Sequence, residues 1–170
     1  NFNAYFLLLT RKFKQLFKIE EIRVYLGVIA VFTTLIAFNV RGCFGSLRES
    51  FHHSLFQVAS IITTTGFSTV DFNQWPAFSK LLLVLLMFIG ACAGSTGGGM
   101  KCSRILLLFK GVKKEMMSLI HPRLVRVHKM DGQRVQHEVM RSVNAFLVAY
   151  LIVIATSILI VSLHCEDMVT

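Results

Sequence analysis

Two short stretches of this 170-residue chain carry residue types that suit ion coordination by the backbone. The first is SIITTTGF, residues 60–67, in which three threonines precede a glycine. Gly66 permits backbone angles that a side chain would forbid, so the chain can turn there and present carbonyl oxygens. Such carbonyls can replace the water shell of an ion. No acidic residue occurs in 50–70, which favours a weakly hydrated monovalent cation over a divalent cation that demands carboxylates.

The second stretch is GSTGGGMK, residues 94–101, which directly follows an apolar run. Glycines clustered inside an apolar segment predict that a membrane helix unwinds there. Irregular backbone at that depth is tolerated only where it is buried in protein or lines a watery cavity. A discontinuous span is therefore a sign of a transport path. Lys101 adjoins the break, and the sequence leaves open whether it faces the cytosol or acts electrostatically at the break.

A structural membrane protein is the alternative interpretation of both stretches. TTTGF alone is equally typical of a kinked loop at the membrane interface. Gly90, Gly94 and Gly98 follow the GxxxG spacing by which membrane helices pack closely. This packing can coexist with an ion path, so the spacing does not separate a transporter from a scaffold.

Enzymatic chemistry finds little support in the same residues. A phosphate-binding loop is disfavoured because Met100 separates the last glycine from Lys101. Ser95 lacks the frame of a hydrolase nucleophile, and no histidine or carboxylate is placed to serve it. The four cysteines share no metal-ligand spacing. We therefore predict no enzyme, no cofactor and no catalytic residue.

Composition indicates a membrane protein. Hydrophobic residues make up 54% of the chain, charged residues 16%, and the mean hydropathy is +0.63; soluble domains are nearer half apolar and a quarter charged. The net charge of +9 does not indicate nucleic-acid binding, because the basic residues lie between apolar runs rather than along one soluble face.

The apolar runs predict the order of the elements. Residues 24–40 and 143–163 are long enough to span a bilayer. Between them, residues 51–63 form a predicted short pore helix that enters and leaves the same face, with Ser50 as its cap. A broken span is expected over 79–112. The predicted fold is therefore an all-α integral membrane fold with the order span, re-entrant pore helix, broken span, cytoplasmic loop and span.

Basic residues predict the orientation of these elements. Of the 18 lysines and arginines, five lie in 1–23 and ten in 101–141. Cytoplasmic loops carry an excess of such residues, so this face is expected to be cytoplasmic. The mouth of the hairpin and residues 164–170 then face outward.

The combination of SIITTTGF with FIGACAGSTGGGMK resembles the Trk/Ktr/HKT superfamily of potassium transporters, and within it most of all the bacterial TrkH/TrkG membrane subunits. Members of this superfamily carry four non-identical span, pore-loop and span repeats around a single pore. The resemblance implies an internal fragment around the third repeat. Its segments would be the end of the preceding repeat with a cytoplasmic linker (1–21), a complete repeat (22–112), a cytoplasmic loop (113–137) and the first span of the next repeat (138–170).

The resemblance also implies roles for the two stretches. One quarter of a potassium filter would be formed by Thr64, Thr65, Gly66 and Phe67. An intramembrane gate would be formed by Gly94, Ser95, Thr96, Gly97, Gly98 and Gly99, together with the adjoining Lys101. The implied surroundings are the bacterial inner membrane, the remaining repeats of the same chain, a homodimer partner and a cytoplasmic nucleotide-binding regulatory subunit.

Overall fold

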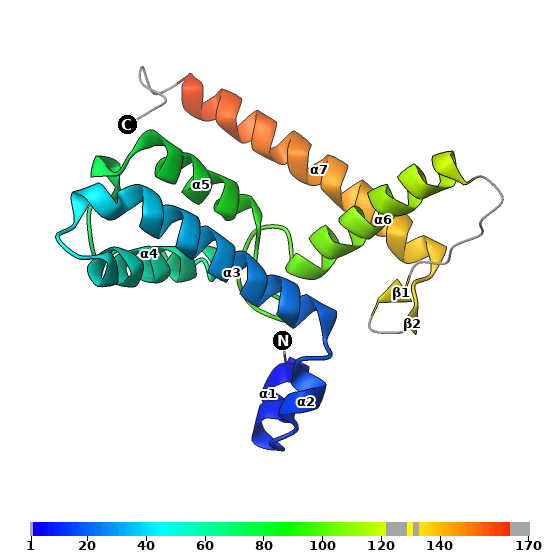
Figure 1. The fold of residues 1–170 in the computed structure, drawn as a ribbon. Coiled ribbons are helices and arrows are strands. Elements are labelled where there is room, and N and C mark those ends of the chain that lie inside the picture. Colours follow the sequence, from blue (N-terminus) through cyan, green and yellow to red (C-terminus); the bar gives the residue numbers. More distant parts are fainter. Residues whose placement is uncertain (1, 122–128, 131–132, 164–170) are drawn as a thin grey trace. The chain divides into compact units, whose positions relative to one another are not determined.

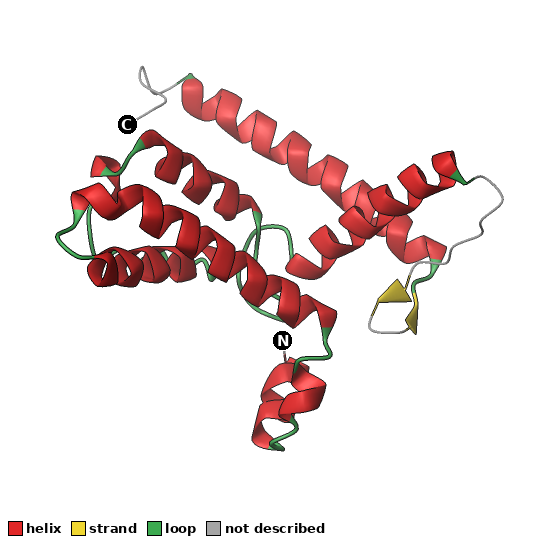
Figure 2. Cartoon of the chain, viewed as in Figure 1, coloured by secondary structure: helices red, strands yellow, loops and turns green. Residues whose placement is uncertain are grey.

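The computed structural model describes residues 2–121, 129–130 and 133–163 (Figure 1). The described chain is helical apart from a small hairpin (Figure 2). In order, the elements are α1 (Phe2–Leu9), α2 (Phe13–Leu16), α3 (Glu20–Asn39), η1 (Val40–Cys43), α4 (Leu47–Ile62), η2 (Phe72–Gln74), α5 (Ala77–Phe88), α6 (Cys102–Ile120), β1 (Lys129–Met130), β2 (Gln133–Arg134) and α7 (His137–Ser162).

The chain divides into two compact units, Asn1–Leu106 and Leu107–Thr170. In the first unit, α3, α4 and α5 lie side by side (Figure 1). Their facing sides meet in a continuous apolar core, which removes these side chains from water and holds the three helices together. The buried members of this core are Ile36, Val40, Val58, Ile62, Trp75, Leu82, Leu83 and Leu86.

A helix is present where 51–63 was predicted to be helical, but it begins earlier than expected. It covers Leu47–Ile62, and its N-cap is Ser46, whose Oγ accepts a hydrogen bond from the Arg48 amide at 3.3 Å. The prediction of Ser50 as the cap was wrong. Ser50 lies one turn inside the helix and donates its hydroxyl to the Ser46 carbonyl at 3.1 Å. The polar residues Arg48 and Glu49 look like loop in the sequence, but Glu49 suits the first turn of a helix because the macrodipole there is positive.

The predicted break in the third apolar segment is also present. Helix α5 ends at Phe88, residues 89–101 are not helical, and α6 begins at Cys102. Helix α6 then continues to Ile120, so the first part of the predicted loop over 113–137 is helical.

The second unit pairs α7 with the later part of α6. Leu107, Met140 and Val143 form its small buried cluster. Strands β1 and β2 pair antiparallel, with Lys129 opposite Arg134 and Met130 opposite Gln133. The predicted outward tail at 164–170 lies outside the described residues. Glu20–Cys43 and His137–Ser162 are each long and apolar enough to cross a membrane, by length and composition.

Candidate functional site

The backbone after α4 adopts an unusual conformation. The φ angles of Thr64 and Gly66 are +57° and +77°, whereas Thr63 has φ −88°. The left-handed region costs an ordinary side chain roughly 1–2 kcal/mol. Strained angles of this kind cluster at functional sites, where the surrounding structure enforces them. Sequence reasoning anticipated the turn at Gly66 but not the one at Thr64.

Amide groups in this segment donate hydrogen bonds back to α4. The amides of Thr63, Thr64 and Thr65 donate to the carbonyls of Ala59, Ile61 and Ser60 at 3.1, 3.0 and 3.0 Å. The carbonyls of residues 63–66, by contrast, accept no hydrogen bond from any residue that the structure describes. Main-chain carbonyls at membrane depth need partners. Residues 63–66 are exposed. Four successive carbonyls without such a partner can coordinate a cation.

Ser60 binds the next carbonyl along the chain, that of Phe67, although sequence reasoning did not include Ser60. Its hydroxyl donates to the Phe67 carbonyl at 2.5 Å, which turns this carbonyl toward α4. The Ser60 carbonyl also accepts from the Thr65 hydroxyl at 3.1 Å. The Phe67 ring is 72% exposed. A hydroxyl residue one turn before the threonines, inside an otherwise apolar helix, was the available signal.

We expect Ser60→Ala to lower the stability of the full protein by about 1–3 kcal/mol, because the Phe67 carbonyl loses its partner. The thermal unfolding temperature in detergent measures this. Ser54→Ala is the matched control: Ser54 is also a buried serine of α4, but its hydroxyl has no hydrogen-bond partner within the described residues. Equal shifts for the two variants would contradict the role of Ser60.

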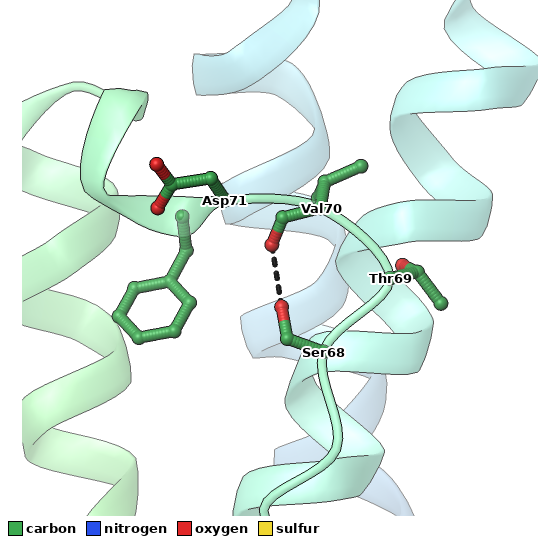
Figure 3. A pocket seen from close by; sticks show the side chains of 5 residues that line it. Ser68, Thr69, Val70 and Asp71 are labelled. Atoms are coloured by element: carbon green, nitrogen blue, oxygen red, sulfur yellow. Dashed lines mark hydrogen bonds between the residues drawn. The ribbon is translucent and has the colours of Figure 1, made fainter.

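Beyond Phe67, the chain is held against the first half of α4. His53 Nδ1 and Thr69 Oγ1 lie 3.0 Å apart, and the His53 ring stacks on Phe44 with centroids separated by 5.0 Å. An open groove of about 370 Å³ follows, lined by residues 68–72. Figure 3 shows the Ser68 hydroxyl bonded to the Val70 carbonyl within it. These contacts fix the chain that follows residues 63–67.

The break between α5 and α6 is a closed loop rather than an open chain. Its two ends pair as a parallel bridge between Ile89 and Met100. The Gly90 amide donates to the Met100 carbonyl at 2.8 Å, and the Cys102 amide donates to the Ala91 carbonyl at 3.2 Å. These bonds satisfy backbone groups that the broken helix leaves without helical partners. We call residues 89–101 the intramembrane loop.

Glycine is required where the two ends of the intramembrane loop cross. A Cβ atom on Gly90 would lie 2.3 Å from the carbonyl oxygen of Gly98. Gly99, with φ +72°, lies on the same crossing. The GxxxG interpretation does not describe this contact, since these residues are not helical and Gly90 packs on its own loop.

The intramembrane loop contacts the turn at residues 63–67 directly. The Gly98 amide donates to Thr64 Oγ1 at 3.2 Å. A Cβ on Gly97 would lie 3.5 Å from the same hydroxyl oxygen and 3.6 Å from the Thr63 carbonyl oxygen. The structure thus brings together two stretches that sequence reasoning singled out separately.

Lys101 forms hydrogen bonds with backbone carbonyls of the intramembrane loop. Its ammonium donates to the Ser95 carbonyl at 2.8 Å and also to the Gly97 carbonyl. Lys101 therefore contacts the loop. Gly94, with φ +76°, and Thr96 are exposed at the tip of the loop.

Two further features complete the site. Glu21, which sequence reasoning did not include, accepts a hydrogen bond from the Ala93 amide at 2.6 Å through its Oε1. An acid at the start of a predicted span looks like an ordinary exposed helix end, so the sequence carried no signal for this contact.

Among the described residues there is no cluster of three or more metal-ligating side chains.

Comparison with known proteins gives consistent matches. The family model described as TrkH, cation transport protein, matches residues 4–169. Trk system potassium uptake protein TrkH of Escherichia coli K12 is 37% identical over 163 residues, which cover 94% of this chain and 34% of the relative. TrkG of the same organism is 36% identical over 175 residues, covering all of this chain and 36% of the relative. The chain spans about a third of the length of these curated relatives.

The fold is matched by a solved structure as well. The crystal structure of the potassium transporter TrkH from Vibrio parahaemolyticus superposes with a TM-score of 0.83 at 34% identity, over 94% of this chain and 35% of the transporter. This similarity and the apolar helices confirm the predicted all-α membrane fold. The chain therefore belongs to the TrkH family of cation transport proteins.

Proposed function

We propose that this chain contributes one repeat of a potassium-conducting pore and serves potassium uptake across the bacterial inner membrane. The observation that carries the proposal is the set of four successive carbonyls of the exposed residues 63–66, which accept no hydrogen bond from the described residues. The names of the relatives, Trk system potassium uptake proteins, support potassium as the transported ion.

In this proposal Thr64, Thr65, Gly66 and Phe67 form one segment of the selectivity filter. The C-terminal end of α4 leads into this segment, and its partially negative macrodipole favours a cation. Neutral carbonyls suit a weakly hydrated monovalent ion. The second lone pair of the Phe67 carbonyl, whose first is held by Ser60, stays available to the ion path.

The intramembrane loop acts as the gate in the same proposal. Gly94, Ser95, Thr96, Gly97, Gly98 and Gly99 form it together with Lys101. Support comes from the contact of Gly98 with Thr64, because a loop that touches the filter can obstruct the ion path beneath it. Conduction then requires that the loop moves away.

We further propose the surroundings that a single repeat needs. The remaining repeats of a longer chain would complete the filter, and the whole would form a homodimer in the bilayer. The basic regions 1–23 and 101–141 would face the cytoplasm and meet a nucleotide-binding regulatory subunit. The protein would be a transporter and not an enzyme.

Uptake in bacteria that lack their own potassium-uptake systems tests the function. The full protein should restore growth at low potassium and should take up rubidium, a potassium analogue. Excess potassium should suppress rubidium uptake far more than excess sodium does. Uptake equal to that of cells carrying an empty vector would contradict the proposal, and so would equal suppression by both ions.

Lys101→Met tests the gate. The variant loses the charged hydrogen bonds to Ser95 and Gly97, each worth about 1.5–3 kcal/mol, so we expect rubidium influx to rise at least about tenfold. The potassium-over-sodium preference should not change. Lys80→Met is the control, because its ammonium bonds to Asn73 outside the loop. Influx that stays at the wild-type level would contradict a role of Lys101 in the gate.

A further inference from the structure

Glu21 is a buried carboxylate at the N-terminal end of a membrane-spanning helix. It is the second residue of α3 and only 2% of its surface is exposed. Glutamate is almost never fully buried unless it is paired. A favourable position in the first turn of a helix does not explain this burial, because Glu20 shares the same turn and is only half-buried.

A contact with the intramembrane loop accounts for the burial of Glu21. The Ala93 amide donates to Glu21 Oε1 at 2.6 Å, across 72 positions of sequence. A hydrogen bond to an ionised carboxylate is roughly twice as strong as one between neutral groups. It also offsets part of the cost of removing the carboxylate from water.

Two side chains of opposite charge, Glu21 and Lys101, bind the backbone of the intramembrane loop. Lys101, which directly precedes α6, donates to the carbonyls of Ser95 and Gly97. Glu21, from the start of α3, accepts from the amide of Ala93. The positively charged ammonium thus binds carbonyl oxygens, and the negatively charged carboxylate binds an amide N–H. The loop is therefore fixed both to the helix that follows it and to a helix far away in the sequence.

We propose that Glu21 is a positioning residue for the intramembrane loop and couples the N-terminal end of α3 to the loop. The coupling of this contact to ion flux rests on the proposed function of the loop as a gate. A shift of this end of α3 reaches the loop through the Glu21 carboxylate, and loss of the carboxylate frees the loop from α3. The contact that Glu21 makes in the described part of the chain is with the intramembrane loop, so we expect it to act on flux and not on ion preference.

Cys92 reports the loop position without any measurement of transport. It is 8% exposed and directly precedes Ala93. In the full protein with Cys92 as its only cysteine, we expect Glu21→Ala to raise the rate of labelling by N-ethylmaleimide about tenfold, the factor expected for a lost charged hydrogen bond. Glu21→Gln, which keeps an oxygen acceptor and the side-chain volume, should give a smaller rise. Glu20→Ala is the control in the same helical turn and should label as the wild type does.

Labelling at the wild-type rate in both Glu21 variants would overturn the proposal, and so would equal acceleration in the Glu20 control. The Gln variant carries the test if the Ala variant does not fold. Rubidium influx, measured on the same variants, separates this proposal from the proposed function. Faster Cys92 labelling with altered influx and unchanged ion preference supports both. Faster labelling with unaltered influx supports Glu21 as the loop anchor and contradicts the loop as a gate.

Discussion

Replacing Gly90 with alanine should abolish regulated transport and sharply reduce the amount of folded protein. The added methyl group would lie 2.3 Å from the Gly98 carbonyl oxygen, which is backbone and cannot rotate away. The two ends of the intramembrane loop would then have to separate, with loss of the bond between Gly90 and Met100. Overpacking of this kind costs typically about 1–3 kcal/mol or more. Size-exclusion chromatography and rubidium uptake of the full protein measure the two effects.

Gly27→Ala provides the control for this experiment. Gly27 lies within α3, and a methyl group there would meet nothing within 4 Å. Since alanine is the better helix former by roughly 1 kcal/mol, this variant should fold at least as well as the wild type. A Gly90→Ala protein with wild-type yield and uptake would show that the observed crossing of the loop is not the functional one.

Neighbouring residues in the sequence were sufficient to single out both stretches of the candidate site, 60–67 and 94–101. The turn at Gly66 and the break in the helix before Lys101 depend on glycine, whose backbone freedom is a property of the residue itself. The order of span, short helix and broken span also follows from the lengths of the apolar runs. These features were predictable because neighbouring residues determine them.

Contacts between distant residues were not predictable in the same way. The bond from Ala93 to Glu21 joins α3 to the intramembrane loop, and nothing near Glu21 distinguishes it from Glu20. The bond from Gly98 to Thr64 also depends on how α4 and α5 pack in three dimensions. The helix start at Ser46 was missed for a local reason, since a polar first turn looks like loop.

Gly66→Ser should lower the preference for potassium over sodium by about tenfold, because holding a side chain at φ +77° costs on the order of 1–3 kcal/mol. The backbone relaxes by turning the carbonyls of Thr65 and Gly66 away from the ion. The methylene that serine adds would meet nothing within 4 Å in this chain, so the effect arises from the backbone angle and not from a clash. The measurement is the permeability ratio of the two ions in the full protein.

Gly94→Ser supplies the matched comparison for that ratio. Gly94 has φ +76° and equally open surroundings, but it lies in the intramembrane loop and not in the filter segment. The two variants thus carry the same backbone strain at different places. If residues 64–67 form a potassium filter segment, the potassium-to-sodium permeability ratio falls in Gly66→Ser and stays at the wild-type value in Gly94→Ser. An unchanged ratio in Gly66→Ser would contradict the filter.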